Sequence, residues 1–424
     1  MLKISFFSFC ILFLFFTGSN TSAQEKTDPW LQQLIQTNAS PLLKHVLNNP
    51  DSFQYQVIYT KIERDKKNEP QFTNYYLHVD RNRYYNPAST VKLPTALAAL
   101  EKLNELHKKG IDRNTSMLID SSFSAQSNVW KDSTSENGYP SIGHYIKKIF
   151  LVSDNDAYCR LYEFLGQQTL NEKLWQKGYT DMRLVRQFIP MTEEENRHTN
   201  QIRFVKDGKI IYQQPPAYDT LHFNFSKQVL VGKGHLDRND KLIMEPMDFT
   251  RHNNFPLEDL QQMLRSVLFP TSAPESTRFR LTKDDYNFLY QYMSQYPSEA
   301  KYPHYDTLEF FDSYTKFFMF KSGKQKIPAN IRIFNKPGWA YGYLTDSEYV
   351  VDFDNKVEFM ISAVIYTNSD GILNDDKYDY DEVGYPFFKE VGNIIYKYEL
   401  GRERKYRPDL RKFMLHYGDG TVNK

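Results

Sequence analysis

Hydrophobic and polar positions in the first half of the chain change from strand-like alternation to a helical period. Residues 54–62 and 72–79 are rich in tyrosine and β-branched side chains, and a polar stretch at 64–70 joins them. This pattern predicts a β-hairpin with a solvated loop. Apolar side chains then recur at helical spacing after position 92, so helices are expected from about 89 to 200.

The second half of the chain interrupts this helical pattern and then returns to strands. Residues from about 201 to 255 form a predicted insertion, in which Asp207-Gly208 turns a hairpin and Pro215-Pro216 breaks the pattern. The later expected elements are two helices at 257–269 and 282–293, strands over 329–366, a helix near 382–399 and a basic tail at about 400–424.

Strands towards both ends of the chain, with helices between them, predict the fold class. We expect an α/β (α+β) protein with one antiparallel sheet built from both chain ends and flanked by helices, plus an all-helical lobe. The 424 residues allow more than one domain. The candidate catalytic residues described below are spread from Ser89 to Lys336, however, which favours one interleaved domain over 24–424.

The composition narrows the range of partners. The 53 basic and 52 acidic residues nearly cancel, which argues against a protein that binds nucleic acid through its net charge. The 31 Tyr and 31 Phe are interpreted as core and surface residues rather than as a stacking platform. The oligomeric state cannot be predicted from the sequence.

The N-terminus has the pattern of a signal peptide. Lys3 precedes an apolar run at 4–16 that is short for a membrane span, and the small residues before Gln24 suit cleavage after Ala23. The residues before Cys10 do not suit lipid attachment. We therefore expect an exported protein, periplasmic or secreted, with residues 1–23 removed and no membrane span in the mature chain.

Cysteine and histidine usage gives no sign of a metal site or cofactor. After cleavage the chain keeps only Cys159, which lies among apolar helical positions and is interpreted as a buried, inert thiol. The ten histidines are scattered, and G-x-S-x-G, H-E-x-x-H and paired C-x-x-C motifs are absent from the sequence. Neither a metal nor a cofactor is expected.

Ser89-Thr90-Val91-Lys92 is the strongest chemical signal in the chain. The motif begins a helical pattern, so the two polar side chains share one face and the Lys92 amine can take the proton of Ser89. A helix N-terminus also offers N–H groups that stabilise an oxyanion. The spacing alone is weak evidence, because Ser298-Glu299-Ala300-Lys301 and Ser313-Tyr314-Thr315-Lys316 repeat it.

Two further motifs make the signal specific. Ser153-Asp154-Asn155 and then Lys336-Pro337-Gly338 follow in the order S-x-x-K, S-D-N and K-T-G, which serine enzymes that recognise penicillin use. With these motifs the chain resembles the class A β-lactamase-like serine hydrolases, over roughly residues 30–400. The stretches 141–152 and 157–166 resemble the helices on either side of the family's S-D-N loop.

The resemblance implies a role for each motif residue. Ser89 would be the nucleophile and Lys92 its base, with a pKa lowered by burial and by Lys336 as a second cation. Ser153 would relay a proton to the leaving nitrogen, and Asn155 would bind both Lys92 and the substrate amide. Beyond these five, Gly338 would let the strand edge approach the substrate closely. The backbone N–H groups of Ser89 and Trp339 would form the oxyanion hole.

Two departures leave the activity open. Pro337 replaces the hydroxyl residue that binds a substrate carboxylate in the family, and it also lacks an N–H. The family's deacylating glutamate has no counterpart in 183–190, although Glu193, Glu194 and Glu195 follow closely.

The sequence supports two classes of function. The favoured one is a serine hydrolase that forms an acyl-enzyme on Ser89 with a β-lactam, peptide or ester, including small-molecule or peptidoglycan-derived substrates, with slow deacylation. The alternatives are a penicillin-binding or DD-peptidase-like enzyme and a non-catalytic cell-wall ligand-binding descendant of the fold. The four intact residues Ser89, Lys92, Ser153 and Lys336 favour catalysis, whereas Pro337 and the missing glutamate favour the non-catalytic alternative. The natural substrate cannot be identified from the sequence.

Overall fold

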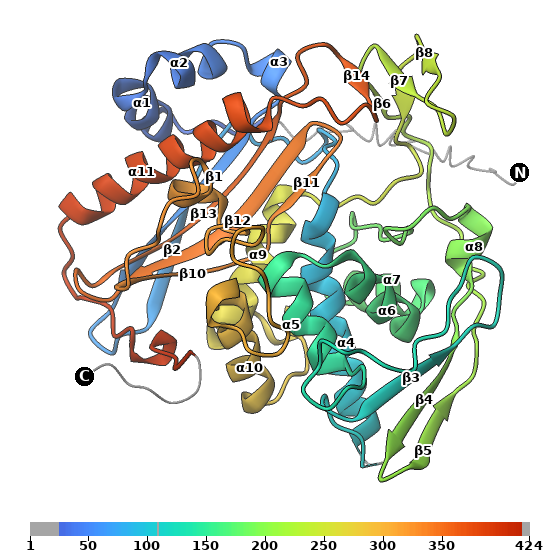
Figure 1. Cartoon of the computed structure of the whole chain (residues 1–424). Coiled ribbons are helices and arrows are strands. Elements are labelled where there is room, and N and C mark those ends of the chain that lie inside the picture. Colours follow the sequence, from blue (N-terminus) through green and yellow to red (C-terminus); the bar gives the residue numbers. More distant parts are fainter. Residues whose placement is uncertain (1–24, 108–109, 418–424) are drawn as a thin grey trace, which may run out of the picture.

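A six-stranded antiparallel sheet organises the computed structural model, which describes residues 25–107 and 110–417 (Figure 1). The strand order is β10-β12-β13-β1-β2, and β11 pairs with β12. The strands are β1 (Gln56–Arg64), β2 (Pro70–Leu77), β10 (Ile331–Asn335), β11 (Gly338–Ala340), β12 (Tyr343–Asp352) and β13 (Val357–Tyr366). The predicted hairpin is confirmed as β1–β2, and the sheet is built from both chain ends as the sequence predicted.

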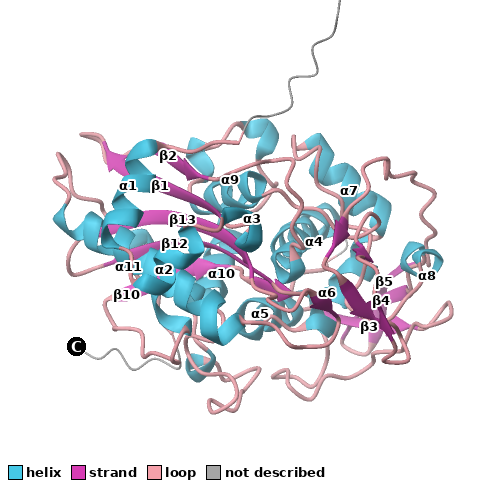
Figure 2. Ribbon diagram, turned by 90° about the horizontal axis from the view of Figure 1, so that it is seen from above, coloured by secondary structure: helices cyan, strands magenta, loops and turns pink. Residues whose placement is uncertain are grey.

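Helices cover both faces of this sheet, so its central strands are buried on both sides. Every residue of β12 and β13 is buried. Along β13 the side chains alternate between two cores, with Met360 and Val364 in one and Phe359 and Ile361 in the other. Figure 2 shows the strands of the sheet side by side, from β2 to β10. The helices α1 (Pro29–Asn38), α2 (Pro41–Leu47) and α11 (Tyr385–Gly401) contribute to the core on one face, and α9 (Leu257–Leu268) and α10 (Lys283–Ser294) contribute to the core on the other.

A helical lobe packs beside the sheet and carries the S-x-x-K and S-D-N motifs. Its elements are η1 (Ala88–Val91), α4 (Lys92–Leu106), α5 (Ile142–Val152), α6 (Asn155–Leu165), α7 (Gln167–Gln176) and α8 (Glu193–Arg197). Ser141 caps α5 by accepting from the His144 N–H, and Asp154 caps α6 by accepting from the Ala157 N–H at 2.7 Å. Both helices begin within two residues of the positions that the sequence predicted.

The expectation of helices alone from about 89 to 200 is wrong at residues 116–120. Residues Ser116–Asp120 form β3, which pairs with β4 (Gln201–Lys206), and β4 in turn pairs with β5 (Lys209–Gln214). Met117 and Ile119 are buried and alternate with less buried neighbours. The local sequence did not reveal this strand because its partner lies about 85 residues further along the chain. The predicted Asp207-Gly208 turn is confirmed, with positive φ at both residues.

The rest of the insertion forms short strands at one end of the main sheet. They are β6 (Leu230–Val231), β7 (Gly234–Leu236), β8 (Leu242–Ile243) and β9 (Met247–Asp248). After β13 the chain returns to this region, where β14 (Ile372–Leu373) pairs in parallel with β7. Two segments far apart in sequence are thereby joined above the motif-bearing end of the sheet (Figure 1).

The C-terminal elements deviate slightly from their predicted bounds. The last helix begins at Tyr385, three residues later than expected, because the irregular turn Tyr380–Gly384 precedes it. The start of the basic tail packs on the protein, since Leu410 and Phe413 are buried. Thr282 and Asp285 form a capping box at the start of α10, at the position where the sequence predicted this helix to begin. The predicted signal peptide at 1–23 lies outside the described residues, and no helix within them is long and apolar enough to cross a membrane.

Candidate active site

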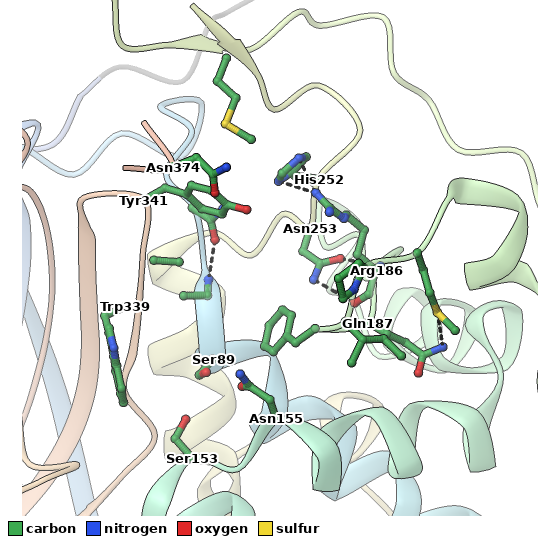
Figure 3. A pocket seen from close by; sticks show the side chains of 18 of the residues that line it. Ser89, Ser153, Asn155, Arg186, Gln187, His252, Asn253, Trp339, Tyr341 and Asn374 are labelled. Atoms are coloured by element: carbon green, nitrogen blue, oxygen red, sulfur yellow. Dashed lines mark hydrogen bonds between the residues drawn. The ribbon is translucent and has the colours of Figure 1, made fainter. Parts of the chain in front are cut away.

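A tight turn presents Ser89 at the start of the long helix of the lobe. Ala88 has φ 44°, a left-handed conformation that non-glycine residues adopt at a cost, and Asn86 Oδ1 stabilises it by accepting from the Ala88 N–H at 2.9 Å. Thr90 closes the turn by donating its hydroxyl to the Pro87 carbonyl at 2.6 Å. Ser89 is only 9% exposed, and it lines a cavity. Figure 3 shows it at the floor of that cavity, near Ser153 and Asn155.

Lys92 lies one turn beyond Ser89 and is fully buried. Its amine donates to the Ser153 carbonyl at 2.5 Å, to the Ser153 hydroxyl at 3.2 Å and to Asn155 Oδ1 at 2.7 Å. The ring of Phe188 lies 5.2 Å from the same amine. Ser153 ends α5 in the left-handed conformation, with φ 63°, which turns both its carbonyl and its hydroxyl towards the lysine.

Lys336 reaches the same hydroxyl from the sheet side. Its amine donates to Ser153 Oγ at 2.9 Å and to the Pro337 carbonyl at 2.7 Å. The structure therefore connects Lys92, Ser153, Asn155 and Lys336 through hydrogen bonds, although 244 positions separate the first from the last in the sequence. Ser89 shares the cavity with Ser153 and Asn155, and the cavity lies between the helical lobe and the edge of the sheet.

Burial sets the protonation of the two lysines. Burial lowers the pKa of Lys92 to about 7, while the charge of Asp154 opposes the change. Burial also lowers the pKa of Lys336 well below its usual value, and the charge of Lys92 lowers it further. Burial, which the sequence led us to expect as a cause, is the main reason for the lowered pKa of Lys92, and the repulsion between the two cations acts on the pKa of Lys336. Two ammonium groups that share one hydroxyl repel each other, so one amine is neutral more readily than an isolated lysine.

The acylation rate should follow the protonation of Lys92. The neutral amine is the base, and a pKa of about 7 means that it is mostly protonated in acid. We expect the rate of labelling by a β-lactam to rise about tenfold per pH unit below pH 7 and to level off above it. Labelling rates from about pH 5 to about pH 9 measure this. A rate that keeps rising through the alkaline range would mean that Lys92 retains its usual pKa.

Gly338 lies against the nucleophile turn rather than at a free edge. A Cβ at this position would lie 2.7 Å from the Ser89 nitrogen, 2.8 Å from the Pro87 oxygen and 2.9 Å from the Thr90 nitrogen. Gly338 was expected to let the strand edge approach the substrate, whereas these contacts are with the turn itself. All three are backbone atoms, so a side chain there must displace either the turn or β11.

Gly338→Ala should therefore impair acylation strongly. A displacement of reacting groups by about 1 Å can lower a rate about 100-fold, and we expect a loss of at least that size. The control is Gly401→Ala in α11, where an added Cβ meets no atom within 4 Å. Labelling rates of the two variants, with thermal unfolding as a check of folding, make the comparison. Equal rates for both would contradict the close packing of β11 on the turn.

A second S-x-x-K sequence lies buried behind the Lys336 strand. The Lys316 amine donates to Asn335 Oδ1 at 2.6 Å and to the Met293 carbonyl at 2.7 Å. Asn335 Nδ2 in turn donates to the Asp346 carboxylate at 2.9 Å. Because Asn335 directly precedes Lys336, this motif holds the strand that carries the second lysine. Ser313 of the same motif is 1% exposed and does not line the cavity.

The loop expected to carry a deacylating acid presents other side chains. The cavity is lined there by Arg186, Gln187, Phe188 and Ile189. Asn253 holds this loop by accepting from the Val185 and Arg186 N–H groups at 2.7 and 3.0 Å.

Of the three following glutamates, only Glu195 lines the cavity. Its carboxylate accepts from the Thr192 N–H at 2.8 Å and from the Ser124 hydroxyl at 3.1 Å. The Thr192 N–H lowers its pKa, which makes it a weaker base. Glu193 pairs instead with Arg251, and Glu194 contacts His198.

Sequence reasoning missed much of the cavity, which has a volume of about 1060 Å³. Residues outside the motifs line it, namely His235, Leu236, Asp237, Arg238, Met247, His252 and Asn253 of the insertion, together with Tyr314, Tyr341 and Asn374. Tyr314 lies in the buried Ser313–Lys316 sequence and Tyr341 follows the Lys336 motif, whereas the sequence around the others carries no recognisable motif. Pro337 and the absence of an acid in 183–190 were the signs of an altered site in the sequence.

The antiparallel sheet beside a helical lobe, with a serine–lysine turn at their junction, is the arrangement that the resemblance to serine β-lactamase-like hydrolases led us to expect. Residues 43–209 match the model of the family described as the Beta-lactamase enzyme family, and this segment contains Ser89, Lys92 and Ser153. Lys336 lies beyond the matched segment, and no curated protein matches the sequence.

Solved structures of β-lactamases are similar at low identity. The β-lactamase from Burkholderia phymatum is 12% identical, with a TM-score of 0.45, and the match covers 86% of this chain and 99% of that one. The β-lactamase from Xanthomonas campestris is 14% identical, with a TM-score of 0.44, and the match covers 83% of this chain and 96% of that one. The β-lactamase from Sphaerobacter thermophilus is 11% identical, with a TM-score of 0.43, and the match covers 84% of this chain and 96% of that one. Identities this low carry no information about the substrate.

Proposed function

We propose that the chain is a serine hydrolase that forms an acyl-enzyme on Ser89 with a β-lactam, peptide or ester. The observation that carries the proposal is the hydrogen-bonded connection from Lys92 through Ser153 to Lys336 beside Ser89. A neutral Lys92 takes the proton of Ser89 as its oxygen attacks the carbonyl. Ser153, which bonds both lysines, passes a proton to the leaving nitrogen.

The remaining motif residues would bind and polarise the substrate. Asn155 orients Lys92 and offers its amide nitrogen to the cavity. The backbone N–H groups of Ser89 and Trp339 are the proposed oxyanion donors, since the N-terminal turn and the edge strand meet there. Deacylation is proposed to be slow, because the carboxylates near the cavity are engaged elsewhere. No step in this scheme requires a metal or cofactor.

Labelling with a fluorescent penicillin tests the proposal. The expected result is a covalent adduct that survives denaturation, and its lifetime separates the two catalytic alternatives. Rapid turnover of a chromogenic cephalosporin indicates a β-lactamase, whereas a stable adduct indicates a penicillin-binding or DD-peptidase-like enzyme. Absence of any adduct, with the protein folded, would favour the non-catalytic descendant.

We also propose that the protein is exported, and that its substrate is a small molecule or a peptidoglycan-derived compound. The support is the N-terminal pattern, with Lys3, the apolar run 4–16 and the small residues before Gln24. N-terminal sequencing of the protein recovered from its producing cells should begin at Gln24. Recovery of the uncleaved chain from the cytosol would contradict export.

A further inference from the structure

Arg186 and His252 contact each other in the wall of the cavity, and the catalytic scheme uses neither of them. Arg186 comes from the loop before α8, and His252 from the end of the insertion. Arg186 Nη1 lies 2.5 Å from His252 Nε2. Burial and the charge of Arg186 lower the pKa of His252 to about 3, so the imidazole is neutral and accepts the hydrogen bond. The histidine therefore orients the guanidinium without adding charge.

The charge of Arg186 is not compensated within the described part of the chain. No carboxylate there lies within ion-pair distance of it, whereas the nearby Arg251 pairs with Glu193 at 2.8 Å. The cavity wall holds two acids, and both are engaged. Thr192 and Ser124 bond Glu195, and Asp237 accepts from two backbone N–H groups of its own turn.

The other cations around the cavity do not substitute for Arg186. Arg238 is exposed and lies near Glu195, whose pKa its charge lowers. Lys92 and Lys336 are buried and bond Ser153. A guanidinium has five N–H donors arranged to hold a carboxylate through two parallel bonds. Contacts between described residues engage Nη1 of Arg186 and none involves Nε or Nη2, which leaves that edge for a ligand.

We propose that Arg186 binds a carboxylate of the substrate, so that the enzyme prefers anionic acyl compounds. The inference rests on the proposed acyl-enzyme function and names the substrate class of that site. Figure 3 shows Arg186 on the wall opposite Trp339, so the carboxylate would bind on the helical-lobe side, across the cavity from the strand. The strand side carries Pro337, which has neither a hydroxyl nor an N–H to offer. The cavity of about 1060 Å³ has room for a substrate whose carboxylate lies on the helical-lobe side, away from the strand.

Acylation by a matched pair of compounds tests the inference. Benzylpenicillin and its methyl ester differ only at the carboxylate, and intact mass measures the rate at which each labels the protein. Arg186→Gln should slow labelling by benzylpenicillin about 10-fold to 100-fold more than labelling by the ester, because a charge-assisted bond is lost. With Arg186→Lys, the rate of labelling by benzylpenicillin should lie between the rates of the wild type and of Arg186→Gln. Arg251→Gln, which removes an exposed arginine outside the cavity, is the control and should not change either rate.

A binding measurement separates this inference from the proposed function. In a Ser89→Ala background, calorimetry with hydrolysed benzylpenicillin should show affinity that Arg186→Gln lowers about 10-fold to 100-fold. Absent binding, or equal affinity with and without Arg186, would overturn the inference. Equal slowing of the acid and the ester by Arg186→Gln would also overturn it, while the acyl-enzyme function stands. If neither compound labels Ser89, the proposed function fails, and the calorimetry still decides the role of Arg186.

Discussion

Ser89→Ala should abolish covalent labelling by β-lactams, and Lys92→Ala should slow it about 100-fold to 10,000-fold. The first change removes the atom that forms the bond, and the second removes the base that accepts its proton. The reason to assign the base to Lys92 is its pKa of about 7, set by burial, together with its bonds to Ser153 and Asn155. Labelling rates measured by intact mass give both values.

A second lysine on the same helix supplies the control. Lys102 is largely buried, its pKa is lowered to about 8, and its amine donates to the Phe164 carbonyl away from the cavity. Lys102→Ala should keep the wild-type labelling rate, provided that thermal unfolding shows a folded protein. Rapid labelling of Lys92→Ala would mean that another group activates the serine. Labelling of Ser89→Ala would indicate another nucleophile, and Cys159 would be the first to test.

The acyl-enzyme formed with benzylpenicillin should be long-lived, and steady-state turnover should follow a burst. Hydrolysis needs a base to activate water, and the loop 183–190 presents Phe188 over Lys92 where an acid is expected. Removing a general base typically costs about 100-fold to 10,000-fold, so deacylation should lag acylation by a factor of this order. Stopped-flow absorbance with a chromogenic cephalosporin measures the burst and the slow phase.

Glu195→Gln provides the control for this prediction. The glutamate lines the cavity but is engaged in capping α8, and glutamine can keep the capping interaction. The adduct lifetime should therefore change less than about threefold, since no base is lost. A much longer lifetime would identify Glu195 as the deacylating base. Rapid hydrolysis by the wild type without a burst would contradict slow deacylation itself.

Local sequence patterns predicted the elements that local interactions determine. The β1–β2 hairpin, the helix that begins at Thr282 and the sheet built from both chain ends follow from alternation, turn residues and capping. β3 was missed, because its strand conformation depends on pairing with β4. A partner that is distant along the chain leaves no signal in the local pattern.

The candidate site, too, was predicted only in part. Motif spacing indicated which residues to bring together, and the structure connects Lys92, Ser153 and Lys336 by hydrogen bonds. The wall formed by Arg186 and His252 could not be predicted, because it depends on how the insertion folds back over the loop. A lowering of the pKa of Lys92 by burial was expected, but the extent of that burial could not be predicted, because it is a property of the whole core.

Mapping the adduct of the wild-type protein with benzylpenicillin tests the central claim most directly. After a brief incubation and denaturation, proteolysis and mass spectrometry locate the modified residue. The account predicts a mass increase equal to intact benzylpenicillin on the peptide that contains Ser89, and on no other peptide. An adduct on Ser313 or Cys159, or a folded protein that acquires no adduct, would contradict it.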